Sequence, residues 1–178
     1  YSTASFSQKI GGNVNISMTP SSGTNYFYCW VDWNQDGDFT DTGETIWATT
    51  SYTANYSGVI PIPAGQAVGE YRVRFANSWS GTITSCGPAA SGSYVDVKLQ
   101  VTLPPVPTLA ATKTDVLCHG GTGSATAVVT DGLAPFTYSW SPSGGTAATS
   151  TGLVAGTYTV TVIDAANRTA TANVTINE

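Results

Sequence analysis

Basic residues are scarce in this sequence. Six Lys and Arg stand against eleven Asp and Glu, and the formal net charge is −5. So few cations cannot build the basic stripe that recognises a phosphate backbone, which argues against nucleic-acid binding. His119 is the only histidine. A zinc site of the His₂Glu or His₃ type is therefore excluded within this chain.

Long apolar runs are also missing. No stretch approaches the roughly 20 residues that span a bilayer, and no signal peptide is recognisable, so we expect no membrane partner. Both termini adjoin strand-like sequence, and we interpret the chain as a piece of a longer polypeptide. Three cysteines in a Thr-rich chain are typical of an oxidising, extracellular setting, and the odd count leaves at least one thiol unpaired within the chain.

Charged helix formers are rare as well. Charged residues make up 10% of the chain, while Gly (19) and Pro (9) are plentiful. This composition disfavours helices, and Thr suits the open faces of sheets. We therefore predict an all-β protein.

A proline-rich segment divides the chain. Residues 103–107 read Leu-Pro-Pro-Val-Pro, a stiff and extended connector, and 15 of the 19 aromatic residues precede residue 103. We predict one domain at 1–103, a linker at 104–107 and a second domain at 108–178. Turn signals at sandwich intervals predict a β-sandwich in each, with a small Ig-like module in the second.

Apolar patterning marks the strands. Residues 26–33 form a nearly continuous aromatic and apolar run, which predicts a strand buried on both faces. Residues 71–75, 95–101 and 158–162 alternate between apolar and polar side chains, as strands with one buried face do.

The strongest chemical signal is the segment 32–44, in which five of the thirteen residues are acidic. Carboxylates packed this tightly repel one another unless a cation joins them, and calcium accepts six to eight oxygen ligands in irregular geometry. The spacing Asp-x-Asn-x-Asp-Gly matches the start of a calcium loop. The predicted ligands from this segment are Asp32, Asn34, Asp36, Asp38 and Glu44.

The rest of the segment departs from an EF-hand. Glu44 falls one place too late, and no flanking helix is evident, so we predict a calcium loop on a β scaffold. Asp41 is expected to point outward, and magnesium is disfavoured because it needs near-ideal octahedral geometry. The alternative is a solvated acidic turn without a metal.

At this segment the chain resembles the GEVED domain family of secreted Bacteroidetes-type proteins. The resemblance covers about residues 1–103 and rests on the run at 30–39, Gly43-Glu44, the run at 60–64, Tyr71-Arg72-Val73-Arg74 and Cys86-Gly87. The family's Gly-Glu-Val-Glu-Asp run reads Gly-Ser-Tyr-Val-Asp at 92–96, without either glutamate. The resemblance implies that Asp96 is an extra carboxylate for the metal or the loop.

The second half resembles an SprB-type repeat, a β module of large bacterial surface adhesins. Cys118-His119-Gly120-Gly121, the run at 135–140 and the run at 153–162 carry the likeness. Where the family often has a second cysteine, Arg168 stands here, which implies that Cys118 has lost its partner. The remaining two, Cys29 and Cys86, are then expected to form a disulfide, the alternative being two buried thiols.

Catalytic machinery is not evident. His119 follows Cys118 directly, and adjacent strand residues point to opposite faces, so we interpret the pair as an ordinary turn. A glycosidase-like carboxylate pair in the acidic segment explains those acids less well than metal ligation does. We predict that this region is not an enzyme.

Aromatic residues suggest binding instead. Trp47, Tyr52, Tyr56 and Trp79 lie in or beside turn-like sequence rich in Ser, Thr and Asn, where a flat ring can stack on a sugar or a proline. The alternative is that they fill the core. Arg72 and Arg74, on an open strand face, are candidates for sulfate or carboxylate groups of an acidic polymer, unless they are solvated or pair with nearby acids.

These features predict a non-catalytic, extracellular accessory module of a larger protein. Its first domain is expected to be calcium-stabilised and to bind a polymer, with polysaccharide favoured slightly over collagen-like protein. The alternative is a structural spacer or adhesin stalk without a ligand. Both resemblances imply export by the type IX route and attachment to enzymes or adhesins.

Overall fold

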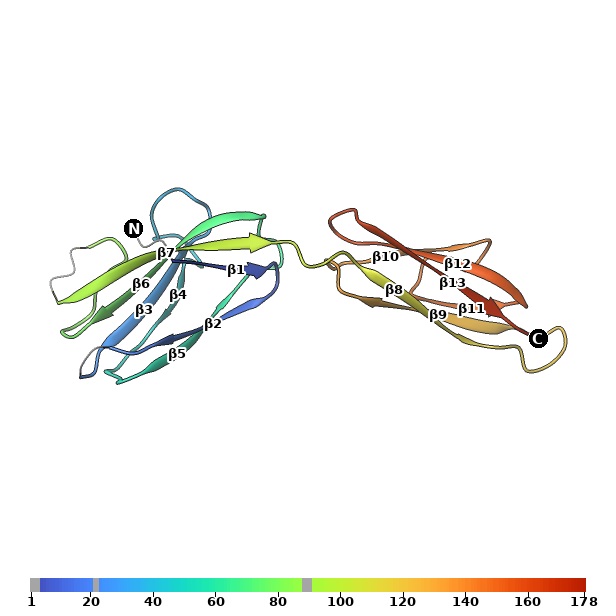
Figure 1. Ribbon diagram of the computed structural model, residues 1–178, viewed down its shortest axis with the longest axis horizontal. Helices are drawn as coiled ribbons and strands as arrows, with labels where there is room; N and C mark the ends of the chain where they lie inside the picture. The colour runs from blue at the N-terminus through green and yellow to red at the C-terminus, as the bar shows by residue number, and fades with distance from the viewer. Residues whose placement is uncertain (1–3, 21–22, 88–90) are drawn as a thin grey trace. The chain divides into compact units, whose positions relative to one another are not determined.

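The computed structural model describes residues 4–20, 23–87 and 91–178, and these form strands and loops without a helix (Figure 1). The predicted all-β fold is confirmed. The chain divides into two compact units, Tyr1–Leu103 and Pro104–Glu178. In the described part of the chain, no helix is long and apolar enough to cross a membrane.

The first unit contains a five-stranded and a two-stranded sheet, with strand orders β1-β7-β6-β3-β4 and β2-β5. β1 runs parallel to β7, and the other pairs are antiparallel. The strands are β1 (Ser5–Lys9), β2 (Asn13–Met18), β3 (Tyr26–Asp32), β4 (Thr45–Ala48), β5 (Tyr56–Pro61), β6 (Gly69–Ser78) and β7 (Gly92–Thr102).

Strand β3 is buried along both faces, as its sequence predicted. One face carries Phe27, Cys29 and Val31 and turns toward the two-stranded sheet, where the ring of Phe27 stacks on Tyr56 of β5 at 6.2 Å between centroids. The opposite face carries Tyr28 and Trp30. These two rings stack at 5.4 Å and share a second apolar cluster with loop residues.

The second unit is a sandwich of two three-stranded sheets, β10-β12-β13 and β11-β9-β8. Its strands are β8 (Thr108–Thr114), β9 (Gly123–Thr130), β10 (Thr137–Ser141), β11 (Thr149–Leu153), β12 (Gly156–Ile163) and β13 (Thr169–Ile176). Inward residues of both sheets meet in one core, which includes Trp140, Tyr158 and Val160. The outward positions of β12 and β13 are mainly Thr, which accounts for the clean alternation of the sequence.

A buried ion pair closes one end of the second unit. Asp164 is 3% exposed and accepts hydrogen bonds from the Arg168 guanidinium at 2.6 and 2.9 Å. Burial by itself raises the pKa of Asp164, but hydrogen bonds from Arg168 and from nearby backbone N–H groups lower it to about 2. Arg168 also donates to the backbone carbonyl of Pro104 at 2.8 Å. Arg168 thus ties the start of the domain to its last hairpin.

We predict that Asp164→Asn destabilises the second domain at neutral pH. Because the folded-state pKa is depressed from 3.8 to about 2, the ionised carboxylate stabilises the fold above pH ~4, and this contribution is lost as the pH falls toward 2. Hydrogen exchange of second-domain amides between pH 2 and 7 measures it. The variant should lose most of the pH dependence, whereas the exposed Asp131→Asn should keep it. Equal pH profiles of exchange for wild type and Asp164→Asn would contradict the stabilising role of the Asp164 carboxylate.

Candidate metal loop and aromatic surface

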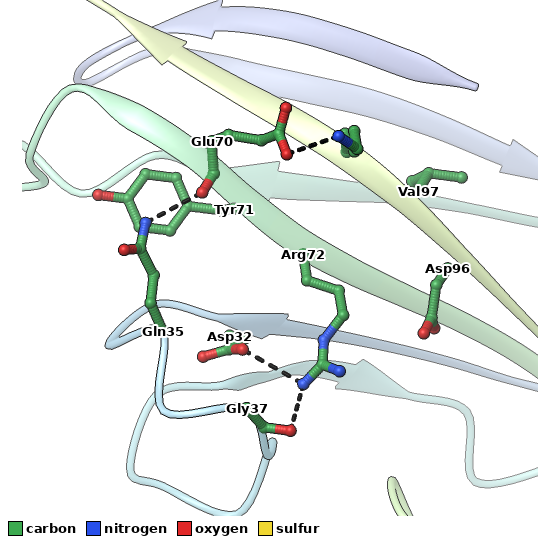
Figure 2. A pocket seen from close by; sticks show the side chains of 9 residues that line it. Asp32, Gln35, Gly37, Glu70, Tyr71, Arg72, Asp96 and Val97 are labelled. Atoms are coloured by element: carbon green, nitrogen blue, oxygen red, sulfur yellow. Dashed lines mark hydrogen bonds and ion pairs between the residues drawn. The ribbon is translucent and has the colours of Figure 1, made fainter. Parts of the chain in front are cut away.

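The acidic loop, residues 33–44, begins where β3 ends at Asp32. Asp32 is buried, and its Oδ2 accepts a hydrogen bond from Arg72 Nη2 of β6 at 3.2 Å. The same nitrogen donates to the carbonyl of Gly37 in the loop (Figure 2). One guanidinium group therefore fixes both the end of the strand and the first turn of the loop. Oδ1 of Asp32 is buried and has no hydrogen-bond partner in the described part of the chain.

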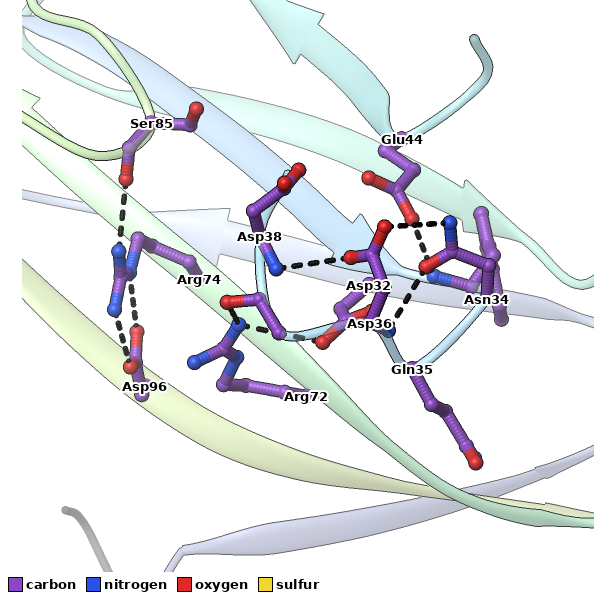
Figure 3. A network of polar contacts seen from close by, with 12 residues as sticks. Asp32, Asn34, Gln35, Asp36, Asp38, Glu44, Arg72, Arg74, Ser85 and Asp96 are labelled. Carbon is purple, nitrogen blue, oxygen red and sulfur yellow. Dashed lines mark hydrogen bonds and ion pairs between the residues drawn. The ribbon is translucent and has the colours of Figure 1, made fainter. Parts of the chain in front are cut away.

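Polar side chains at alternate positions shape the loop (Figure 3). The N–H of Asp36 donates to Asn34 Oδ1 at 3.1 Å, and the N–H of Asp38 donates to Asp36 Oδ1 at 3.0 Å. The N–H of Thr40 continues the series to Asp38 Oδ1 at 2.8 Å. Asx turns of this kind explain why short Asp and Asn side chains are needed at these positions. Gly37, with φ of 99°, makes the sharp turn between them.

Three carboxylates meet in the middle of the loop. Asp36, Asp38 and Asp41 each place an oxygen within 4.8 Å of the others. The Nδ2 of Asn34 donates to Asp36 at 3.0 Å and to Asp41 at 2.6 Å. The backbone hydrogen bond from Asp38 is the main cause that lowers the pKa of Asp36. This set of oxygens has the chemistry of a hard-cation site.

Glu44 has a different position. It is 1% exposed, and its carboxylate accepts the N–H groups of Trp33 at 3.0 Å and Asp41 at 3.3 Å. Burial raises the pKa of Glu44, and these backbone hydrogen bonds oppose that effect. Glu44 therefore links the two ends of the loop from inside.

Phe39 fastens the loop to the sheet. Its side chain is 2% exposed, and the guanidinium groups of Arg72 and Arg74 lie 4.5 and 4.8 Å from the ring centroid. Arg74 also holds both oxygens of Asp96 at 2.6 Å and donates to the carbonyl of Ser85 at 2.8 Å. Each arginine is thus engaged by an acid and by an aromatic face. This role of Phe39 was not predicted from the sequence. A single aromatic residue inside a polar loop would have indicated that the loop packs onto the sheet through it.

The predicted metal ligands therefore separate into groups. Asn34, Asp36 and Asp38 come together, and Asp41, expected to point outward, joins them. Asp32 and Glu44 occupy the buried ends of the loop. Asp96 lies on β7 and pairs with Arg74 at 2.6 Å, apart from the three central carboxylates.

The predicted polymer-binding residues also divide. Trp47 and Tyr56 pack together at 4.5 Å between centroids, and Trp47 lies 6.3 Å from Phe75. Both are half-buried between the sheets, so they fill the core and offer no open platform. Arg72 and Arg74 form ion pairs with Asp32 and Asp96, in agreement with the alternative that they pair with nearby acids.

Tyr52 and Trp79 remain at the surface, 46% and 60% exposed. The hydroxyl of Tyr52 donates to the carbonyl of Trp79 at 3.3 Å and accepts the N–H of Gly81 at 3.4 Å. Its ring packs on Tyr26 with 4.3 Å between centroids. The orientation of the Tyr52 ring is therefore fixed while much of the ring stays open to solvent.

The predicted Cys29–Cys86 disulfide is absent, since Cys29, Cys86 and Cys118 are all free thiols. Cys29 is buried on the face that turns toward the two-stranded sheet, and burial strongly raises the pKa of its thiol. Cys86 is exposed and directly follows Ser85, whose carbonyl accepts a hydrogen bond from Arg74 on the other face. A disulfide needs side chains that point at each other, which the intervening sheet prevents.

His119, 96% exposed, lies 3.7 Å from Glu178.

Both units of the chain are built from β-sheets alone. Residues 26–100 match the GEVED domain and residues 110–145 match the SprB repeat. The chain carries a GEVED domain followed by an SprB repeat, as the sequence motifs predicted. Neither is a catalytic family, and both indicate an extracellular or surface protein.

The chain is also similar, at low sequence identity, to several solved structures. The full ectodomain of mouse nectin-like molecule 4 is 18% identical, with 94% of this chain and 59% of that chain covered and a TM-score of 0.34. The C-terminal 282-residue fragment of intimin, in complex with the intimin-binding domain of its translocated receptor, is 11% identical, with 93% and 57% covered and a TM-score of 0.34. Domains 3 and 4 of rat CD4 are 8% identical, with 98% and 100% covered and a TM-score of 0.27. No curated protein matches the chain.

We predict that Phe39→Ala lowers the free energy of unfolding of the first domain by about 3–5 kcal/mol, the usual cost of removing a buried phenylalanine. Both arginines lose their contact with this ring at the same time. Denaturant titration monitored by first-domain signals measures the change. Phe39→Leu, which keeps much of the buried volume, should cost less. A stability unchanged by Phe39→Ala would show that the loop is not anchored by this ring.

Proposed function

We propose that the chain is a non-catalytic accessory region of a larger extracellular protein, stabilised by calcium and binding a polysaccharide through its first domain. The cluster of Asp36, Asp38 and Asp41 supports the calcium part. The exposed, oriented rings of Tyr52 and Trp79 support the binding part. A structural spacer without a ligand is the competing function, and the half-buried positions of Trp47 and Tyr56 favour it.

The residues present fit calcium. All the candidate donors are oxygens of carboxylates, a carboxamide or the backbone, which calcium accepts in irregular arrangements. The amide nitrogen of Asn34 now lies against two carboxylates, and a turn of that amide would present its oxygen instead. The buried, unpartnered Oδ1 of Asp32 is a further acceptor at the start of the loop. A bound cation would offset the repulsion among the three central carboxylates and rigidify the loop.

Removal of calcium should lower the melting temperature of the first domain. At a free concentration of 100 times the Kd, a ligand bound only to the folded state stabilises it by about 2.7 kcal/mol, and each kcal/mol is worth about 4–8 °C in a domain of this size. Differential scanning calorimetry with calcium and with EDTA measures this. The double variant Asp36→Asn, Asp41→Asn should melt alike in both, whereas the second-domain variant Asp131→Asn should respond as wild type does. Identical wild-type curves would remove calcium from the proposal.

The surface around Tyr52 and Trp79 suits a sugar. Its neighbours Ser80, Gly81 and Thr82 are exposed and uncharged, so the rings can stack on the apolar face of a pyranose while hydroxyl and backbone groups bond its edge. The fixed orientation of Tyr52 reduces the entropy lost on binding. Polysaccharide is favoured over collagen-like protein because the polar rim carries no charge.

Trp79→Ala should weaken retention on insoluble or soluble polysaccharides by about tenfold, equivalent to ~1.4 kcal/mol, because it deletes the largest exposed ring. Affinity electrophoresis across a panel of glycans, with collagen in a parallel pull-down, measures it. Leu117→Ala, which removes an exposed apolar side chain from the second domain, is the matched control. Retention of the wild type by none of these polymers in calcium would favour the spacer.

A further inference from the structure

A cleft of about 370 Å³ lies between the acidic loop and the outer face of β6 and β7 (Figure 2). Gln35 and Gly37 of the loop line one side, and Glu70, Arg72 and Lys98 of the two strands line the other. Gln35 donates its amide N–H to the carbonyl of Glu70 at 3.0 Å. The loop is thereby held as a wall over the sheet.

The charges around this cleft compensate one another. Arg72 pairs with Asp32 at 3.2 Å, and Lys98 pairs with Glu70 at 2.8 Å. The remaining acid, Asp96, is paired with Arg74 at 2.6 Å. Because each charge already has an opposite partner, the cleft has no surplus charge with which to select an ion. Its chemistry favours a neutral, polar ligand.

Hydrogen-bonding capacity nevertheless remains in the cleft. The guanidinium of Arg72 is engaged by Asp32 and Gly37, and its Nε is buried and not open to a ligand, so the capacity lies with Lys98. The ammonium of Lys98 has three N–H donors, and the described ion pair with Glu70 uses one. The aliphatic stems of these two side chains provide apolar surface between the donors. A sugar ring offers matching groups, hydroxyl oxygens at its edge and C–H groups on its face.

We propose that this cleft binds a single neutral sugar residue, and that calcium in the acidic loop strengthens the binding. The volume is at the small end of ligand pockets, which run from about 300 to 1,000 Å³, and so suits one ring better than a long chain segment. Calcium acts indirectly, since Asp36 and Asp38 flank Gly37 in the wall of the cleft. The inference rests on the proposed calcium and polysaccharide functions and adds a site separate from Tyr52 and Trp79.

Solution NMR of the ¹⁵N-labelled chain tests this cleft. Methyl glucoside, methyl mannoside and methyl galactoside are titrated to high millimolar concentration in calcium and in EDTA. We expect at least one sugar to shift the amides of residues 35–37, 70–72 and 96–98, with an affinity several-fold lower in EDTA. Lys98→Met should weaken the binding without changing calcium affinity. Lys113→Met, which breaks the second-domain ion pair with Asp115, should not.

The outcomes separate the cleft from the calcium and polysaccharide functions on which it rests. Shifts confined to the surroundings of Tyr52 and Trp79 would overturn the cleft and leave the polysaccharide function standing. Shifts in the cleft that are equal in calcium and EDTA would overturn the coupling alone. The absence of shifts at residues 35–37, 70–72 and 96–98 with all three sugars, or shifts unaffected by Lys98→Met, would overturn the site. Calorimetry of the same samples reports separately on calcium.

Discussion

The ring of Phe39, covered by two guanidinium groups, is the contact on which the first domain depends. Strand β3 is buried on both faces and must be covered on each, and the two-stranded sheet covers only one of them. The acidic loop contributes to the other because Phe39 joins Tyr28, Trp30 and Ala76 in the second cluster. Arg72 and Arg74 can lie over this ring since Asp32 and Asp96 compensate their charges. A loop with a polar sequence thereby becomes part of a core.

This anchoring divides the loop into parts with different roles. Asp32 and Glu44 are buried at its ends and bond to Arg72 and to backbone N–H groups. Asp36 and Asp41 are exposed in its middle. The ends therefore hold the loop in place through contacts within the protein, and the middle presents oxygens outward on a largely formed scaffold. A site built in this way loses little conformational entropy when it binds a cation.

Much of the fold could be predicted from residue patterns, because alternation and continuous apolar runs report directly on which strand faces are buried. The acidic loop was also predictable, since Asx turns require short polar side chains at fixed spacing. The partners of Arg72 and Arg74 could not be predicted, because they depend on strand register and on a loop that crosses the sheet. The Cys29–Cys86 prediction was wrong for a related reason: sequence does not show on which side of a sheet a distant loop lies. Whether Trp47 fills the core and Trp79 remains exposed is likewise decided by tertiary packing.

The parallel pairing of β1 with β7 has a mechanical consequence. Ser5 to Lys9 lie beside Lys98 to Thr102 in register, so the first strand of the domain and its last one are joined side by side. Tension entering before β1 and leaving after β7 pulls the two strands along their length in opposite directions. The hydrogen bonds between the two strands are then loaded together. In a hairpin opened from its free end, by contrast, they would break one after another. The domain is therefore built to resist stretching along the chain.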